Sequence, residues 1–204
     1  MEKIGLTGGI CTGKTFVLNI FKEFKTYTVM ADEIAKNFIF SKDSPILGKL
    51  EEIFGEEVVD KNKGVNKPML SKILFQDGSK RELLNHTILP YLIEERESTY
   101  IDLKKNSNYD FFIYESALLV ESGTYKDFDK IVVVYTTPEE QFKRLQQRDQ
   151  LSAEETENRI KSQYPLSEKL KVANYIIDTT GSFELSRTKA LETYYLMKKD
   201  SKID

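Results

Sequence analysis

Short apolar runs alternate with longer amphipathic segments along the chain. Five of the runs have the length and the aromatic or β-branched composition of strands, namely Lys3–Leu6, Tyr27–Ala31, Phe111–Glu115, Lys130–Tyr135 and Tyr175–Ile177. The segments between them show the spacing of helices that cover a sheet. This alternation predicts a three-layer α/β/α fold around a five-stranded parallel sheet.

The longest interval between predicted strands runs from Asp32 to Asn108 and reads as several helices in series. Its boundary signals are a helix start at Ser44-Pro45, a stop at Gly55, a turn over Asp60–Gly64, a cap at Asp77 and a start or kink at Pro90. We therefore expect a helical insert over residues 41–107.

A second group of helices follows the fourth run. Pro138 opens a helix that carries Gln141 and places Arg144 and Arg148 four residues apart on one cationic face. The next helix begins with a capping box at Ser152–Glu155 and ends at Tyr164-Pro165. We expect residues 139–172 to form a lid region.

The last predicted helix, about Ser182–Lys199, is amphipathic and should cover the sheet. Its apolar positions are Phe183, Ala190, Leu191, Tyr194 and Met197.

The composition fits one globular domain over residues 1–204, because 204 residues with 40% hydrophobic content can bury a substantial core. A net charge of -3 gives no reason to expect a nucleic acid as partner. No segment approaches the roughly 18 apolar residues needed to span a bilayer, so we expect a cytoplasmic protein without a membrane partner. The sequence leaves the oligomeric state unknown.

A single cysteine rules out an intrachain disulfide and a cysteine-based zinc site.

The chemistry of the chain is most visible directly after the first predicted strand, where the sequence matches the phosphate-loop pattern G-x-x-x-x-G-K-S/T. The eight residues are Gly8, Gly9, Ile10, Cys11, Thr12, Gly13, Lys14 and Thr15. A strand, a glycine-bracketed turn and a helix start would aim backbone N–H groups at a polyphosphate. The pattern predicts binding of ATP or GTP with Mg²⁺. The alternative is a glycine-rich turn without a ligand.

Individual loop residues fit separate roles in this interpretation. Gly8 and Gly13 let the backbone approach phosphate oxygens, and Lys14 brings an ammonium to the β- and γ-phosphates. Thr15 would place its hydroxyl on Mg²⁺. We read Cys11 as a small side chain that fits the loop; the alternative is a redox switch.

Ligands of parallel sheets collect beyond the carboxyl ends of the strands, and two carboxylates stand there. Asp32 follows the second strand and suits the base that accepts a proton from an attacking hydroxyl; its alternative role is a helix N-cap. Glu115 ends the third strand and is predicted to organise Mg²⁺ through water, with a plain surface glutamate as the alternative.

Two arginines and the one histidine complete the set of candidates. Arg144 and Arg148 could close over the nucleotide and screen charge on the migrating phosphoryl group; otherwise they are solvated helix residues. His86 lies in the predicted helical insert, and we read it as structural.

Several ordered segments resemble the dephospho-coenzyme A kinase family. They are Ile4–Ile10 with the loop lysine, Ala31–Lys36, Leu118–Glu121, Arg144 with Arg148-Asp149, and the series Gln163, Pro165, Lys169 and Ala173–Asp178. The resemblance spans nearly the whole chain and is far more specific than the phosphate loop alone. It implies a P-loop kinase-like fold with a substrate-binding insert and a lid.

The resemblance also implies an activity. The chain would be a transferase that uses ATP to phosphorylate the ribose 3′-hydroxyl of dephospho-coenzyme A, the last step of coenzyme A biosynthesis. Asp32 would be the base, assisted by Lys14 and Arg148. The loop with Arg144 and Arg148 would hold ATP, and the helical insert would hold the acceptor. The acceptor would also meet Asp32, Leu118, Leu119 and Glu121.

The chain departs from the family pattern at five positions. Cys11 stands for a glycine, Met30 for the first Asp of Asp-Ala-Asp, Leu89 for a histidine before Pro90, Ala117 for a proline and Thr179 for an asparagine. The changes at Met30 and Leu89 bear on acceptor positioning.

Other functions stay open from the residues alone. Another small-molecule or nucleotide kinase would use the same loop, base and lid, and a catalytically impaired ATP-binding homologue is suggested by Met30 and Leu89. A GTPase is disfavoured because its D-x-x-G element would be Asp178–Gly181, after the fifth strand. A motor-type ATPase would carry Asp-Glu where Glu115-Ser116 stands.

Overall fold

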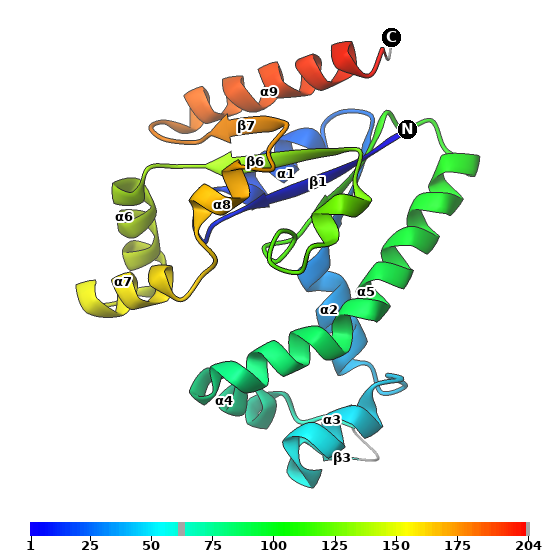
Figure 1. The fold of residues 1–204 in the computed structure, drawn as a ribbon, viewed down its shortest axis with the longest axis vertical. Helices are drawn as coiled ribbons and strands as arrows, with labels where there is room; N and C mark the ends of the chain where they lie inside the picture. Colours follow the sequence, from blue (N-terminus) through cyan, green and yellow to red (C-terminus); the bar gives the residue numbers. More distant parts are fainter. Residues whose placement is uncertain (61–63, 203–204) are drawn as a thin grey trace. The chain divides into compact units, whose positions relative to one another are not determined.

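The structure is a computed structural model that describes residues 1–60 and 64–202. The chain forms two compact units. The first contains Met1–Val29 and Leu103–Asp204, and the second contains Met30–Asp102. We call them the sheet unit and the helical unit (Figure 1). The expected single domain over residues 1–204 remains a prediction, and the expected insert over residues 41–107 overlaps most of the helical unit.

A five-stranded sheet is the framework of the sheet unit, with strand order β2-β5-β1-β6-β7. The strands are β1 (Glu2–Gly8), β2 (Thr26–Met30), β5 (Phe111–Glu115), β6 (Lys130–Tyr135) and β7 (Tyr175–Asp178). β1 pairs in parallel with β5 and with β6, and β6 pairs in parallel with β7. All five predicted strands are confirmed, and the second ends one residue earlier than predicted because Ala31 already begins α2 (Ala31–Phe40).

The central strand β1 lies where the order of the sheet reverses. The chain leaves β1 for β2 at one edge and later returns to β6 on the other side of β1. In open α/β sheets, ligands bind beyond the carboxyl ends of the strands at this reversal. The residues after Gly8 therefore occupy the expected place for a binding site.

Helices cover the sheet on both faces. α1 (Lys14–Phe21) packs against α9 (Phe183–Asp200), and α8 (Leu166–Leu170) contacts β1 and β6. Figure 1 shows α8 in front of the sheet and α1 behind it. Ala190, Tyr194 and Met197 of α9 are buried as predicted, and Leu191 is half-buried. The prediction for Phe183 is wrong, because this first residue of α9 is 74% exposed, with its ring beside that of Phe16.

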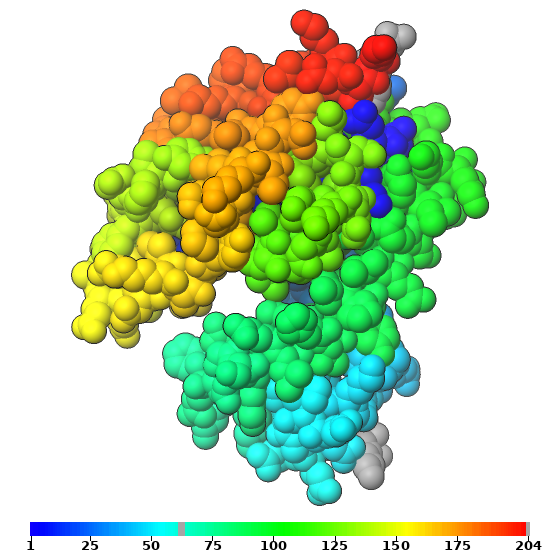
Figure 2. Space-filling model, in the orientation of Figure 1, coloured from blue at the N-terminus to red at the C-terminus, as the bar shows by residue number. Residues whose placement is uncertain are grey.

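Residues 139–172, the predicted lid region, contain most of α6, all of α7 and all of α8. α6 (Pro138–Asp149) is capped by Thr137, and α7 (Ala153–Lys161) begins with the predicted capping box between Ser152 and Glu155. The two helices pack against each other. In Figure 2 the yellow side chains of α7 form an outer margin of the sheet unit. A short 3₁₀ helix, η2 (Thr124–Asp127), precedes β6.

The helical unit contains the series of helices that the long interval predicted. Its elements are α2 (Ala31–Phe40), α3 (Leu47–Phe54), the 3₁₀ helix η1 (Glu56–Val58), β3 (Val59–Asp60), β4 (Gly64–Val65), α4 (Lys67–Gln76) and α5 (Gly78–Asn106), which returns the chain to the sheet unit. Its own core is built around Ile46, Leu50, Leu70 and Leu84. β3 and β4 pair in antiparallel fashion. The predicted turn between them falls partly on residues 61–63, outside the described residues.

The boundary signals of this unit succeeded in part. Gly55 ends α3 with φ of 98°, and Asp77 caps α5 by accepting from the backbone N–H groups of Ser79 and Lys80. The predicted start at Ser44 is wrong. α3 begins at Leu47 after a fully buried Ile46, because burial of that side chain fixes the start more strongly than the serine does.

Pro90 does not start a helix. It lies inside α5, which continues through it and bends along its length in Figure 1. Proline cannot donate to the carbonyl one turn earlier and normally breaks a helix. Here the buried side chains of Leu84, Ile88 and Leu92 hold both sides of the proline in the core of the unit.

A Gly5→Ala substitution tests how tightly β1 is packed. A Cβ at Gly5 would lie 2.6 Å from Leu119 Cδ2 and 2.8 Å from Ile131 Cδ1, and both of these side chains are buried. We expect a loss of about 1–2 kcal/mol in the free energy of unfolding, because the core must shift to admit the methyl group. Denaturant unfolding followed by circular dichroism measures it.

Gly48→Ala is the matched control. A Cβ at this position in α3 meets nothing within 4 Å, so alanine should be neutral or stabilising by up to about 1 kcal/mol. Equal stability of the Gly5 and Gly48 variants would show that packing around β1 is looser than these distances indicate.

Candidate active site

The phosphate loop joins the end of β1 to the start of α1, as predicted. Gly8 must be glycine because a Cβ would lie 2.5 Å from the backbone oxygen of Val134 on β6. Gly13 precedes α1 with φ of 91°, a left-handed conformation that glycine adopts at little cost. The loop is therefore folded by backbone constraints, and it leaves the first N–H groups of α1 without intrahelical acceptors.

The loop also forms hydrogen bonds with itself. Thr12 is fully buried, and its hydroxyl donates to the carbonyl of Gly9 at 3.0 Å. Lys14 Nζ donates to the carbonyl oxygens of Gly8 and Gly9 at 3.2 and 2.9 Å. Thr15 is exposed in the first turn of α1. The ammonium therefore lies over the loop itself, where a phosphate oxygen would compete with the carbonyls.

Two glutamines hold the tip of the loop. Gln141 Nε2 on α6 donates to the carbonyl of Ile10, and Gln163 Oε1 accepts from the N–H of Ile10, both at 2.8 Å. Sequence reasoning named both glutamines but gave neither a role. The sequence offered one signal for each: Gln163 belongs to the family resemblance, and Gln141 lies on the predicted lid helix. Contacts over more than 100 residues leave no local pattern.

Cys11 replaces a glycine in a demanding conformation. Its φ of 57° lies in the left-handed region, which costs an ordinary side chain about 1–2 kcal/mol. Partial burial raises the pKa of the Cys11 thiol, and the nearby Arg148 guanidinium opposes this effect. A raised pKa reduces the thiolate population, which agrees with a small packed side chain rather than a reactive sulfur.

The two lid arginines are engaged differently. Arg144 forms an ion pair with Glu140 and donates to Thr179 Oγ1 and to the Thr179 carbonyl, at 3.1 and 2.6 Å. Arg148 is more exposed and donates to both carboxylate oxygens of Asp149, at 2.7 and 3.0 Å. Arg144 is therefore anchored to the end of β7, whereas the hydrogen bonds of Arg148 go to its neighbour on α6.

Asp149 is an acidic partner that Arg148 shares with α7. It also pairs with Arg159 of α7 at 3.1 Å, so it joins the two lid helices. The hydrogen bond from Arg148 lowers the pKa of the Asp149 carboxyl, and it also raises the pKa of the guanidinium. The predicted cationic face is therefore partly neutralised.

The residues after β5 divide into buried and exposed positions. Glu115 ends β5 beside Leu6 of β1 and is 5% exposed, so the alternative of a plain surface glutamate is wrong. Leu118 is 43% exposed, whereas Leu119 is fully buried near Gly5. Of the two leucines, only Leu118 offers substantial side-chain surface to a ligand.

Glu121 contacts a buried lysine. Both Glu121 oxygens accept from Lys169 Nζ at 2.7 Å, and the carbonyl of Ala117 accepts from the same atom at 2.6 Å. Burial lowers the pKa of Lys169, and the Glu121 carboxylate opposes that shift. This ion pair attaches the segment 117–121 to α8, so part of what Glu121 does is structural.

Asp32 lies exposed in the first turn of α2, beside Glu33. The N-cap of this helix is Met30, so the alternative role of Asp32 as N-cap is wrong. A carboxylate in the first turn interacts favourably with the helix dipole. His86 is exposed on α5 within the helical unit.

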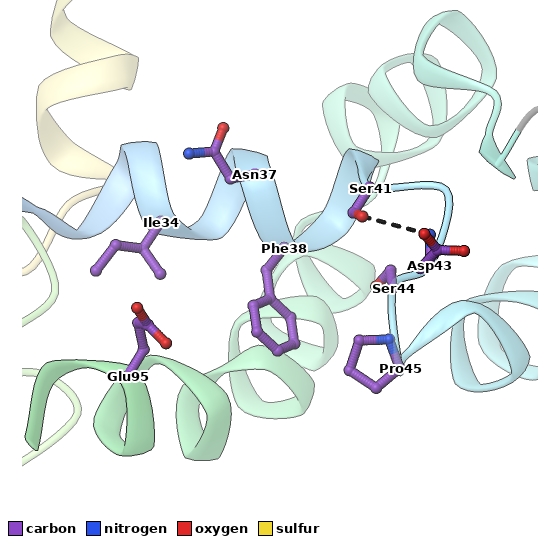
Figure 3. A pocket seen from close by; sticks show the side chains of 8 residues that line it. All are labelled: Ile34, Asn37, Phe38, Ser41, Asp43, Ser44, Pro45 and Glu95. Carbon is purple, nitrogen blue, oxygen red and sulfur yellow. Dashed lines mark hydrogen bonds between the residues drawn. The ribbon is translucent and has the colours of Figure 1, made fainter. Parts of the chain in front are cut away.

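A pocket of about 380 Å³ lies within the helical unit. Its lining is Ile34, Asn37, Phe38, Ser41, Asp43, Ser44, Pro45 and Glu95. Figure 3 shows the Phe38 ring and the Glu95 carboxylate approaching the hollow from α2 and α5. An adjoining hollow of about 350 Å³ shares Phe38, Pro45 and Glu95. The pocket combines an apolar wall with hydroxyl, amide and carboxylate groups. Sequence reasoning expected acceptor binding here but identified none of these residues.

Among the helices of residues 1–60 and 64–202, none combines the length and apolar character required to cross a membrane.

A Glu121→Gln substitution tests the ion pair. It leaves the Lys169 ammonium buried without its counter-ion, and we expect a loss of about 2–3 kcal/mol in unfolding free energy at pH 7. Burial already lowers the pKa of Lys169 below its unfolded value, and the variant lowers it further. The unfolded chain then binds more protons between the two pKa values, so stability rises with pH there and the deficit should shrink towards pH 10.

Glu157→Gln is the control, because the Glu157–Lys161 pair is exposed on both sides and should contribute about 0.5 kcal/mol or less. Chemical unfolding at pH 7 and pH 10 provides the comparison. A deficit that is the same at both pH values would contradict a charge-based role for Glu121.

Comparison with known proteins gives a consistent family. The family model for dephospho-CoA kinase matches residues 3–184. A dephospho-CoA kinase of Aquifex aeolicus is 36% identical over 199 residues, which cover 98% of this chain and 95% of that protein. A solved structure of dephospho-CoA kinase from Campylobacter jejuni aligns with a TM-score of 0.71 at 27% identity and covers 98% of both chains.

A shikimate kinase from Acinetobacter baumannii aligns over 98% of this chain and 94% of that one, with a TM-score of 0.55. At 16% identity this likeness concerns the fold alone. The near-complete matches, together with the phosphate loop after β1, show that the chain belongs to the dephospho-CoA kinase family.

Proposed function

We propose that the protein transfers the γ-phosphoryl group of ATP to the ribose 3′-hydroxyl of dephospho-coenzyme A, giving coenzyme A and ADP. The observation that carries this proposal is the family match over residues 3–184, which includes the complete phosphate loop. The folded loop supports it, because Gly8 and Gly13 already have the backbone geometry that a phosphate cradle requires.

The nucleotide is held by residues 8–15 and by the start of α1. The backbone N–H groups at this helix end donate to phosphate oxygens, and the positive helix end adds to the attraction. Lys14 exchanges its bonds to the Gly8 and Gly9 carbonyls for phosphate oxygens. A bound Mg²⁺ would neutralise phosphate charge. The hydroxyl oxygen of exposed Thr15 could ligate it directly, and the Glu115 carboxylate could hold one of its water ligands, because Mg²⁺ prefers oxygen ligands.

Phosphoryl transfer needs a base and a screen for negative charge. Asp32 accepts the proton of the attacking hydroxyl, and its exposed position in α2 leaves the carboxylate accessible to an acceptor. Lys14 and Arg148 stabilise charge that develops on the transferred group. Arg148 is suited to move, because its hydrogen bonds to Asp149 are exposed and easily exchanged.

The acceptor is bound in part by the helical unit. Glu95 and Asp43 line its pocket, so the pocket disfavours the diphosphate of dephospho-coenzyme A. It suits the uncharged pantetheine arm, whose amides and hydroxyl match Asn37, Ser41 and Ser44 around the Phe38 ring. We assign the exposed Leu118 to the acceptor as well.

Substitution of the base tests the reaction. Asp32→Asn should lower kcat about 100-fold or more, because general base catalysis contributes roughly 10²–10⁴, while ATP binding stays close to that of the parent. Glu33→Gln removes the neighbouring exposed carboxylate and should change kcat less than twofold. A coupled assay of ADP release with dephospho-coenzyme A measures both.

The same assay separates the competing functions. Equal or faster turnover with nucleoside monophosphates or shikimate would favour another small-molecule kinase. ATP binding without turnover on any acceptor would favour a binding protein that has lost catalysis, as Met30 and Leu89 suggested. An active enzyme unaffected by Asp32→Asn would show that the base has been assigned wrongly.

The pocket is tested by Asn37→Ala, which removes an exposed amide from its rim. We expect the KM for dephospho-coenzyme A to rise about three- to tenfold through loss of a hydrogen bond, with the KM for ATP unchanged. Lys36→Ala changes the preceding exposed side chain, which does not line the pocket, and should leave both values unchanged. An unchanged acceptor KM in the Asn37 variant would place the pantetheine arm elsewhere.

A further inference from the structure

A threonine at the end of β7 connects two parts of the nucleotide site. Thr179 is 2% exposed, and its hydroxyl lies 2.7 Å from the carbonyl oxygen of Thr12 in the phosphate loop. The same hydroxyl lies 3.1 Å from Arg144 Nη1. The carbonyl oxygen of Tyr135, at the end of β6, also lies 3.1 Å from this hydroxyl. Because a hydroxyl has one hydrogen, it accepts from Arg144 and donates to one carbonyl, of which that of Thr12 is the nearer. The loop and the lid arginine therefore share one oxygen atom.

The geometry around Arg144 shows how completely this contact orients the guanidinium. Its Nη2 donates to the Thr179 carbonyl at 2.6 Å, and its Nε donates to Glu140 at 3.0 Å. Arg144 thus directs three of its five N–H groups to protein acceptors, two of them on Thr179. The other two N–H groups are left for a ligand. Because the guanidinium is planar and rigid, their direction follows from the orientation that Thr179 sets.

The backbone of Thr179 is fixed independently of its side chain. Its N–H donates to the carbonyl of Tyr135 at the end of β6, at 2.9 Å. The hydroxyl therefore projects from a rigid strand end. Movement of the loop or of Arg144 away from it breaks a buried hydrogen bond, while Thr179 itself stays in place.

We propose that Thr179 is a positioning residue for the nucleotide, which fixes the Thr12–Gly13 turn of the phosphate loop and the Arg144 guanidinium relative to each other. This inference rests on the proposed use of ATP. Thr179 acts through the loop N–H groups and Arg144 and contacts no reacting atom. Without its hydroxyl, the buried Thr12 carbonyl loses a donor and the start of α1 is less firmly aligned.

The fit of Thr179 to the loop explains why a compact side chain works here. A Cβ on Gly13 would lie 3.4 Å from both Cγ2 and Oγ1 of Thr179, so the side chain fills the space beside that glycine. The methyl group supplies packing, and the hydroxyl supplies both hydrogen bonds. The two contributions can be separated, because valine keeps the shape without the hydroxyl and serine keeps the hydroxyl without the methyl.

The experiment compares Thr179→Val and Thr179→Ser with the parent protein. Isothermal titration calorimetry gives the Kd for a non-hydrolysable ATP analogue with magnesium, and steady-state assays give KM for each substrate. We expect T179V to raise the Kd and the KM for ATP about tenfold and to leave the KM for dephospho-coenzyme A within twofold. T179S should stay within about threefold of the parent.

Thr180→Val is the matched control, because the Thr180 hydroxyl bonds to residues 136 and 137 and not to the loop. It should change neither KM.

A double-mutant cycle with Arg144→Lys distinguishes positioning from general loss of structure. If Thr179 orients Arg144, R144K weakens ATP binding less in the T179V background than in the parent. Effects that simply multiply would overturn the proposal, as would an equal rise of both KM values in T179V or a T179S variant as impaired as T179V. Should T179V fail to fold, Thr179→Ala takes its place in the cycle.

The calorimetric arm also separates this inference from the proposed function. If the parent binds the ATP analogue but does not turn over dephospho-coenzyme A, the proposed reaction fails while the binding comparison still decides the role of Thr179.

Discussion

The close approach of two backbones dominates this structure. Gly8 of β1 lies so near the Val134 carbonyl of β6 that no side chain fits between them. The chain must turn sharply there, and the left-handed Gly13 then sends it into α1. The direction of α1, and with it the direction of its free N–H groups, follows from these two contacts. Every other candidate residue can act on a nucleotide only because this turn is in place.

Charge around the loop is balanced by short-range partners that a polyphosphate could replace. Lys14 lies on two carbonyl oxygens, and Arg148 lies on the carboxylate of Asp149. Arg144 differs, because two of its bonds go to the rigid end of β7. The site therefore combines cations that can be redirected at small cost with one cation whose direction is fixed, which favours both capture and orientation of a charged ligand.

Local signals predicted most of the fold but only part of the site. Strands, caps and the phosphate loop depend on neighbouring residues, so Gly55, Asp77 and the Ser152 capping box were identified from the sequence. The predicted start of α3 at Ser44 is wrong, and of the two roles predicted for Pro90 the helix start is wrong, because buried side chains distant in sequence outweigh the local preference. The Lys169 partner of Glu121 and the glutamines on Ile10 depend on contacts over 48 to 153 residues, which no local pattern encodes.

Gln141 and Gln163 hydrogen-bond to the main-chain carbonyl and N–H of Ile10 and not to its side chain. The identity of the side chain at position 10 therefore carries little of the information that shapes the loop tip. The shape of the loop tip depends instead on positions 141 and 163, because few other side chains could replace a carboxamide in these two hydrogen bonds. Natural variation in this chain should accordingly be permissive at the apex of the loop and restrictive at two sites that look unremarkable in the linear sequence.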